Sequence, residues 1–379
     1  MDTALQRKIG QLLAVGIHGT DLGDARIQQV IQQAEAGLIG GVIIYRYNIV
    51  NREQLTELLQ GLRRAKTQFP LLVFVDQEGG KIQRIDSSLG FHDTPSAKDI
   101  ANSATVAQAR QIYTDLGQEL HATGFNFDLA PCVDLDDDPS CPAIGQLARS
   151  YGTDPELVAD YGQAMINGLK DHGVFSCIKH YPGHGRARGD SHTGLLDITN
   201  TWSEVELEPF KLLVERGDVD AVMTSHLVHQ GVDHGTPVTF SRHWLQRLRT
   251  EVGFDGLIVA DDLHMGAIIS HYSLSETVIL GLNAGLDQLM FSNNPLAAQP
   301  QGIRHDVQAD VEQVVTGEWQ VPDPGLPEKI NSAVLSAISD GRLTRDVIEH
   351  AYQRVTALKA TLNTVEKPRL TTTIDRQPR

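Results

Sequence analysis

The sequence predicts a single (β/α)8 TIM barrel with a C-terminal helical extension, and three observations lead to this fold class. Short apolar runs alternate with longer segments of helical period. Eight such runs occur, and no shift in composition divides them before about residue 295. Polar residues follow directly after most of the runs. A barrel takes about 250 residues, which fits this length. A doubly wound open sheet is the structural alternative, although it seldom needs so many repeats.

The predicted strands are continuous apolar runs, several of them rich in β-branched residues. This pattern is typical of parallel strands that are covered on both faces. In chain order the strands are Leu12 to Ile17, Gly41 to Tyr45, Leu71 to Val75, Phe125 to Ala130, Val174 to Ile178, Ala221 to Thr224, Gly256 to Ala260 and Asp287 to Phe291.

Amphipathic segments between these strands predict the helices of the barrel. Residues Val106 to Ala122 place apolar side chains on one face, and Gly124 follows as a stop signal. Asn51 and Gln54 have the spacing of a capping box, which marks a helix start.

The pattern changes after the last predicted strand. A proline-rich stretch follows that is longer than an ordinary connection, so it is either a functional loop or partly disordered. Two further helices are predicted at Glu328 to Ser339 and Thr344 to Leu362. The predicted organisation is a barrel catalytic domain at residues 1–294, a proline-rich connecting segment at 295–327, C-terminal helices packing on the barrel at 328–362 and a mobile tail at 363–379.

Composition narrows the classes of partner and compartment. The net charge of −16 and the pI near 5.3 argue against nucleic acid and anionic membranes, because both require a basic face. No stretch is long and apolar enough for a membrane helix or a signal peptide. Cys132, Cys141 and Cys177 are an odd number without a CxxC pair, which predicts reduced thiols and a cytoplasmic protein.

Polar residues, most of them ionisable, gather at the predicted strand ends. In a barrel the loops after the strands meet at one rim, so these side chains are expected to converge there. The residues concerned are Asp76, Gln77 and Glu78 after the third strand, Asp134 after the fourth, Lys179 and His180 after the fifth, Ser225 and His226 after the sixth, and Asp261 and Asp262 after the seventh.

The richest stretch runs from Val174 to Ile198, where a buried strand gives way to a loop dense in titratable groups. Asp190 and His192 on this loop have the types needed for a carboxylate–imidazole pair that carries out general acid/base chemistry. Asp261, at the end of a rigid strand, suits a nucleophile or an electrostatic stabiliser. Together they form a set typical of glycosidases.

Five motifs extend this interpretation to a family. They are DQEGGKIQR (Asp76 to Arg84), RSYG (Arg149 to Gly152), KHYPGHG (Lys179 to Gly185), DSH (Asp190 to His192) and ADDLHMGA (Ala260 to Ala267). With these motifs the chain resembles glycoside hydrolase family 3, and within it the single-domain bacterial β-N-acetylglucosaminidases (β-N-acetylhexosaminidases) of cell-wall recycling. The resemblance covers about Ile9 to Asn294 and resumes weakly in the C-terminal helices.

The resemblance implies a retaining hydrolase that removes terminal β-linked N-acetylglucosamine from peptidoglycan fragments through a glycosyl-aspartate. It implies that Asp261 is the nucleophile, His192 the acid/base and Asp190 its partner. It also implies that the sugar hydroxyl groups are held by Asp76, Arg84, Arg149, Lys179 and His180. No cofactor and no metal are expected. The expected partners are small N-acetylglucosaminides and muropeptide-like fragments, and the expected assembly is a monomer or weak homo-oligomer.

Three rival functions stay open at this point. A phosphorylase is one, because a neutral histidine does not repel phosphate as a carboxylate base would. A metal-dependent barrel hydrolase is another, since His180, His184, His192 and Asp261 include common metal-ligand types. The third is a non-catalytic sugar-binding protein.

Overall fold

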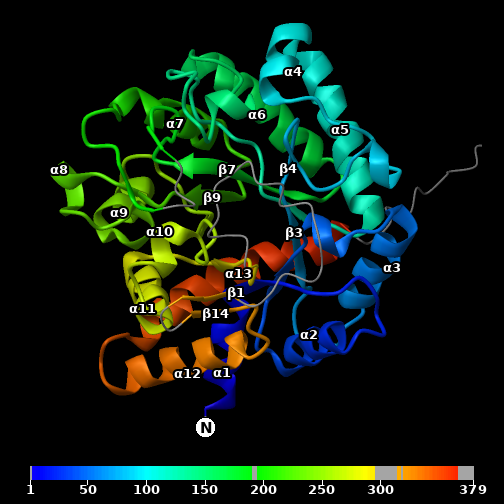
Figure 1. The fold of residues 1–379 in the computed structure, drawn as a ribbon, viewed down its shortest axis with the longest axis vertical. Helices are drawn as coiled ribbons and strands as arrows, with labels where there is room; N and C mark the ends of the chain where they lie inside the picture. Colours follow the sequence, from blue (N-terminus) through cyan, green and yellow to red (C-terminus); the bar gives the residue numbers. More distant parts are fainter. Residues whose placement is uncertain (1, 190–193, 295–313, 317–318, 366–379) are drawn as a thin grey trace, which may run out of the picture.

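The computed structural model describes residues 2–189, 194–294, 314–316 and 319–365, and its centre is a ring of eight parallel strands (Figure 1). The order around the ring is β11-β9-β7-β6-β3-β2-β1-β12. Their bounds are β1 (Leu13–Gly16), β2 (Gly41–Ile43), β3 (Leu72–Val75), β6 (Phe127–Asp128), β7 (Phe175–Tyr181), β9 (Ala221–Thr224), β11 (Leu257–Val259) and β12 (Leu289–Phe291). A parallel bridge between Val259 and Gln288 joins the two end strands. The predicted barrel is therefore confirmed, and the open sheet is excluded.

The strand residues pack as the apolar runs predicted. Val15, Val42 and Val73 stand in register on three neighbouring strands and are buried. Phe74 and Phe127 are also in register, with ring centroids 4.5 Å apart. Because successive side chains point to opposite faces, each strand contributes both to the barrel interior and to the layer beneath the helices.

Helices surround the ring on its outer side (Figure 1). The Asn51 side chain accepts a hydrogen bond from the Gln54 N–H at one helix start, and Gly124 ends another helix at a φ of 117°. The helices of the outer layer are α2 (Ala25–Ala36), α3 (Arg52–Arg63), α4 (Ala97–Ser103), α5 (Val106–Thr123), α6 (Pro155–Lys170), α7 (Glu208–Arg216), α8 (Gln230–Asp233), α9 (Arg242–Thr250), α10 (Gly266–Ile269) and α11 (Leu274–Ala284).

Short elements sit in the connecting loops. The paired strands are β4 (Gln77–Gly79) with β5 (Ile82–Gln83), β8 (Leu196–Asp197) with β10 (Leu227–Val228), and β13 (Val314–Thr316) with β14 (Trp319–Val321). The 3-10 helices are η1 (Arg46–Asn48), η2 (Ser87–Leu89), η3 (Gly145–Leu147), η4 (Glu204–Leu207) and η5 (Val238–Phe240).

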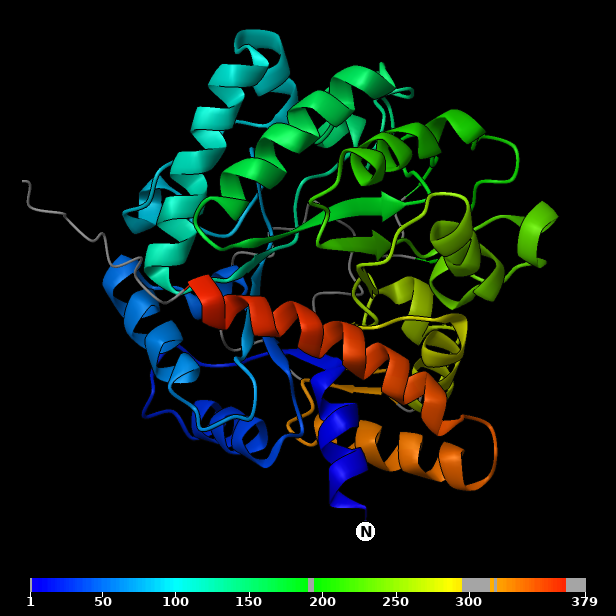
Figure 2. The same cartoon turned by 180° about the vertical axis from the view of Figure 1, so that it is seen from behind.

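The amino ends of the strands are covered by α1 (Thr3–Gln11) and α13 (Arg345–Val365), whereas α12 (Leu326–Ser339) packs against α11 and contacts α2 through Glu328 and Gln33. Figure 2 shows α13 in red crossing this end of the barrel beside α1 in blue. Lys359 of α13 is fully buried there and donates hydrogen bonds to Gln11 Oε1 (2.7 Å) and Gly40 O (2.6 Å). Helices α1 and α13 form the barrel floor and leave the opposite rim free for chemistry.

The stretch after β12 lies partly outside the described residues, since 295–313 and 317–318 are among those not described. Where it is described, Trp319 is buried against His264 and Phe291 near the carboxyl ends of β11 and β12. Its indole N–H donates to Tyr272 O at 2.8 Å. Across all the described ranges, none of the helices combines the length and apolar character needed to cross a membrane.

Candidate active site

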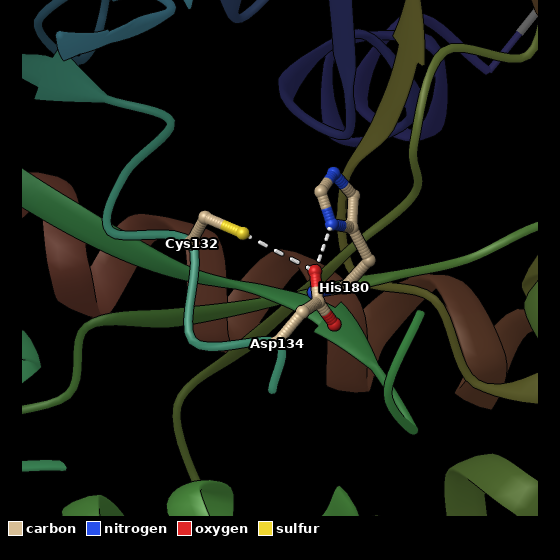
Figure 3. Close-up of side chains that lie close together, drawn as sticks. All are labelled: Cys132, Asp134 and His180. Atoms are coloured by element: carbon tan, nitrogen blue, oxygen red, sulfur yellow. Dashed lines mark hydrogen bonds and ion pairs between the residues drawn. The ribbon is translucent and has the colours of Figure 1, made fainter. Parts of the chain in front are cut away.

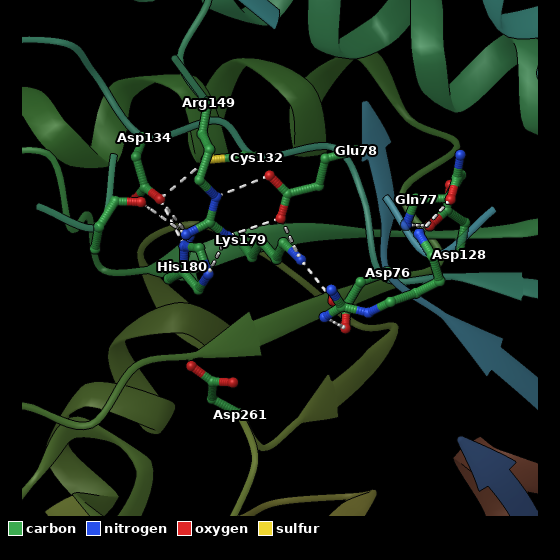
Figure 4. A network of polar contacts seen from close by, with 12 residues as sticks. Asp76, Gln77, Glu78, Asp128, Cys132, Asp134, Arg149, Lys179, His180 and Asp261 are labelled. Atoms are coloured by element: carbon green, nitrogen blue, oxygen red, sulfur yellow. Dashed lines mark hydrogen bonds and ion pairs between the residues drawn. The ribbon is translucent and has the colours of Figure 1, made fainter. Parts of the chain in front are cut away.

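A row of alternating charges lies at the carboxyl ends of the strands (Figure 4). Lys179, which is 2% exposed, places its Nζ 2.6 Å from Glu78 Oε1 and 3.1 Å from Asp76 Oδ1. On one side of the row, Arg84 Nη2 donates to Asp76 Oδ2 at 3.0 Å. On the other side, Arg149 makes a two-pronged contact with Glu78, through Nε at 2.9 Å and Nη2 at 2.7 Å. We refer to these five residues as the charged row.

The neighbours in the charged row keep one another ionised. Burial opposes ionisation of Glu78, but the charges of Arg149 and Lys179 outweigh it and hold the pKa of Glu78 well below its usual range. Burial likewise opposes the charge on Lys179, whereas Glu78 and Asp76 raise its pKa above the usual value. The pKa of Asp76 is lowered despite its burial, by Lys179 and Arg84. The result is a rigid, fully charged set of donors and acceptors that suits the hydroxyl groups of a sugar.

His180 extends this row through a buried carboxylate. Its Nδ1 lies 2.6 Å from Asp134 Oδ2, and its Nε2 lies 3.1 Å from Arg149 Nη2. Because a guanidinium only donates, Nε2 must accept, so the ring proton is on Nδ1 and is donated to Asp134. Burial alone would raise the pKa of Asp134, but the neighbouring His180 lowers it to about 2.

Cys132, Asp134 and His180 form a compact group of residue types that also bind metals (Figure 3). Their arrangement does not fit a metal centre. Both ring nitrogens of His180 are engaged, one by Asp134 and the other by Arg149, and the Arg149 charge would repel a cation. Cys132 is a buried thiol that donates to Asp134 Oδ2 at 3.3 Å, and burial raises its pKa well above the usual value.

Asp261 and Asp262 follow β11 and have different surroundings. The carboxylate of Asp261 is directed toward the charged row across the barrel mouth (Figure 4). Asp262 instead accepts hydrogen bonds from the backbone N–H groups of Ser292 (2.7 Å) and His264 (3.0 Å). Asp262 thus braces β11 against β12, and the Asp262 N–H donates to Asp261 Oδ1 at 2.8 Å, which fixes that carboxylate.

The structure brings together six of the residues that the sequence analysis assigned to the site. They are Asp76, Arg149, Lys179, His180 and Asp261, which Figure 4 labels, and Arg84, which is bonded to Asp76. Asp190 and His192 lie outside the described residues. On the amino-terminal side of these residues, the Arg186 guanidinium pairs with Asp137 at 2.8 Å. On the carboxyl-terminal side, β8 pairs with β10.

Two residues at the centre of the network, Glu78 and Asp134, were expected at the rim from the sequence but were given no role in the site. Glu78 links Lys179 to Arg149, and a signal for it existed: it stands two residues after Asp76 on an extended segment, so both point the same way. Asp134 pairs with His180 across 46 positions, and no local pattern indicates that pairing.

The barrel, the charged row and the strand-end carboxylate opposite it define the chain as a glycoside hydrolase. The chain belongs to glycosyl hydrolase family 3, since residues 4–358 match the model of the "Glycosyl hydrolase family 3 N terminal domain". The resemblance to this family and the prediction of a glycosidase are thereby confirmed.

Relatives with assigned names agree with this membership. The beta-hexosaminidase LpqI of Mycobacterium tuberculosis is 36% identical over 294 residues, which cover 74% of this chain and 71% of the relative. A beta-hexosaminidase of Tolumonas auensis is 33% identical over 320 residues, 81% of this chain and 92% of that protein.

A solved structure of a family 3 beta-N-acetylglucosaminidase from Paenibacillus superposes with a TM-score of 0.81 at 30% identity. It covers 96% of this chain, whereas this chain spans 63% of the length of that enzyme. The likeness therefore extends over nearly all of this chain.

Proposed function

We propose that this protein removes terminal β-linked N-acetylglucosamine from small saccharides by a retaining double displacement. Asp261 attacks the anomeric carbon and forms a glycosyl ester, while His192, oriented by Asp190, protonates the leaving group. The same histidine then takes a proton from water, which hydrolyses the ester. Asp76, Arg84, Arg149, Lys179 and His180 hold the sugar hydroxyl groups.

The observation that carries this proposal is the position of Asp261. Its carboxylate faces the charged row, so a sugar held by that row would present a carbon to a fixed nucleophile. The proposed preference for N-acetylated sugars rests on the names of the relatives, which are beta-hexosaminidases and a beta-N-acetylglucosaminidase. The three cysteines are free and buried, which supports a reducing compartment such as the cytoplasm and, with it, a role in recycling cell-wall fragments.

A panel of aryl β-glycosides tests the substrate. We expect the N-acetylglucosaminide to be cleaved much faster than the glucoside and the galactoside. Release of glycosyl phosphate as the main product in phosphate buffer would assign the protein to the phosphorylases instead.

Trapping with a slow fluorinated N-acetylglucosaminide tests the nucleophile. Mass spectrometry should find the sugar on the peptide that contains Asp261 in the wild type and on no peptide of Asp261→Asn. An unlabelled wild type that is inhibited by a thiazoline would show that the acetamido group of the substrate is the nucleophile.

A further inference from the structure

A carboxyl group outside the charged row is buried without a partner. Glu206, on η4, is 1% exposed, and neither of its carboxyl oxygens has a hydrogen-bond partner among the residues that the structure describes. Burying such a group costs free energy, so an unpaired one calls for an explanation beyond stability.

Glu206 is packed directly against the turn at residues 182–185 that follows β7. A Cβ added to Gly183 would lie 2.5 Å from Glu206 Cβ and 2.8 Å from its Oε2. Gly183 also has a φ of 121°, which only glycine adopts readily. A second contact from the same segment reinforces the first, because the Trp202 indole N–H donates to Pro182 O at 3.0 Å.

The same turn is tied to the sugar-binding histidine. The Gly183 N–H donates to His180 O, and the His184 N–H donates to Asp134 Oδ1, both at 2.8 Å. Asp134 in turn holds the ring of His180. A displacement of the turn would therefore shift the imidazole relative to Arg149 and the rest of the charged row.

The groups that face Glu206 favour an uncharged carboxyl. They are Asp134 and Asp137 from the loop after β6, and Arg186 from the loop after β7. Arg186 is already paired with Asp137. Burial and the charge of Asp134 raise the pKa of Glu206 to about 8, although Arg186 and the Ser203 backbone oppose this. Burial lowers the pKa of His184 to about 4, so this imidazole is also neutral at pH 7.

We propose that Glu206 is a positioning residue of the sugar site, whose uncharged side chain fills the space against Gly183 and holds the turn at 182–185 so that His180 stays aligned with Arg149. When Glu206 loses its proton, Asp134 and Asp137 repel the new negative charge. The carboxylate then moves toward water, and this movement displaces the turn. Binding of sugar then weakens in alkaline solution. The sugar-binding part of this inference rests on the proposed function, whereas the movement of the turn does not.

Tryptophan fluorescence tests the movement without any substrate, because Trp202 contacts the turn. We expect the emission of the wild type to change between pH 7 and 9, and the change to be absent from Glu206→Gln and from Trp202→Phe. The matched control is Glu208→Gln, an exposed carboxylate next along the chain that pairs with Lys211, and it should titrate like the wild type. A wild type without the change, or the same change in Glu206→Gln, would overturn the proposal.

Kinetics with 4-nitrophenyl N-acetyl-β-glucosaminide provide the second readout. If only the protonated form aligns His180, kcat/KM of the wild type should fall about tenfold between pH 7 and 9 through a rise in KM, and Glu206→Gln should lack this fall. Should Glu206→Gln fail to fold, the wild-type fluorescence and KM curves must share one midpoint, and separate midpoints would overturn the proposal. If the glycoside is not cleaved at all, the proposed function fails, while the fluorescence test still decides the role of Glu206.

Discussion

Replacing Glu78 by Gln tests whether the charged row is one cooperative unit. Glu78 is the carboxylate that Lys179 and Arg149 share, with contacts of 2.6 to 2.9 Å to both. Its side chain is 5% exposed, so the two cations would be left buried, close together and without their shared anion. Each would then disfavour the charge of the other.

The expected loss of folding stability follows from the burial of Glu78 and its two cationic partners. Removing one partner of a buried ion pair costs about 3 to 5 kcal/mol. With an unfolding entropy of about 2 cal/mol/K per residue, this corresponds to a decrease in Tm of about 4 to 7 °C for 379 residues. The pKa of Glu78 is depressed in the folded state, so its contribution is present above about pH 4.5 and is lost as the pH falls below that value.

Thermal unfolding and steady-state kinetics measure the two consequences. We expect Tm to fall as calculated and kcat/KM to fall about 100-fold, because displacements of about 1 Å in a site have effects of that size. The matched control is Glu119→Gln of α5, whose side chain is 7% exposed and pairs with Arg52 of α3 and with His92 in the loop before α4. It should lose stability without a change in KM. A Glu78→Gln variant with wild-type Tm and KM would refute the reasoning.

Three further outcomes are expected. Burial lowers the pKa of Lys359 in the folded state to about 7. Between pH 7 and 10 the unfolded state therefore binds more protons at this lysine than the folded state does. The stability of the wild type relative to Lys359→Met should therefore rise over that window, by at most about 1.4 kcal/mol per pH unit, and equal pH dependences in thermal unfolding would contradict this. Dialysis against EDTA should leave glycosidase activity unchanged, since side chains supply every contact in the proposed mechanism; activity lost and then restored by zinc would favour a metal-dependent hydrolase. His192→Ala should slow substrates with poor leaving groups most, by about 10² to 10⁴, and equal losses of the glycosylation rate on good and poor leaving groups would count against an acid role.

The parts of the fold that were predictable from the sequence are those with a local cause. Runs such as Leu72–Val75 are apolar throughout because both faces of a parallel strand are covered, and the alternation with helices then dictates a barrel. The topology also explains why Asp76, Lys179 and Asp261 meet at one rim, since Asp76 and Asp261 follow β3 and β11 and Lys179 lies near the carboxyl end of β7.

The parts that escaped prediction depend on contacts between distant segments. Lys359 looks like any surface lysine of an amphipathic helix, and only the packing of α13 on the floor buries it. Glu206 carries no motif, and its role emerges only when η4 is placed over the turn after β7. The role of Glu78 could have been predicted from the sequence, because side-chain alternation along an extended segment directs Glu78 to the same side as Asp76.

The barrel floor has a consequence for how the protein is made. Lys359, the hydrogen-bond partner of Gln11 and Gly40, lies 348 and 319 residues further along the chain than these two residues. All eight strands therefore leave the ribosome before the helix that covers their amino ends exists, and at a typical 5 to 20 residues per second the delay after β12 lasts roughly several seconds. During this interval the nascent barrel presents an open apolar end, which is the surface that a chaperone at the ribosomal exit would be expected to shield.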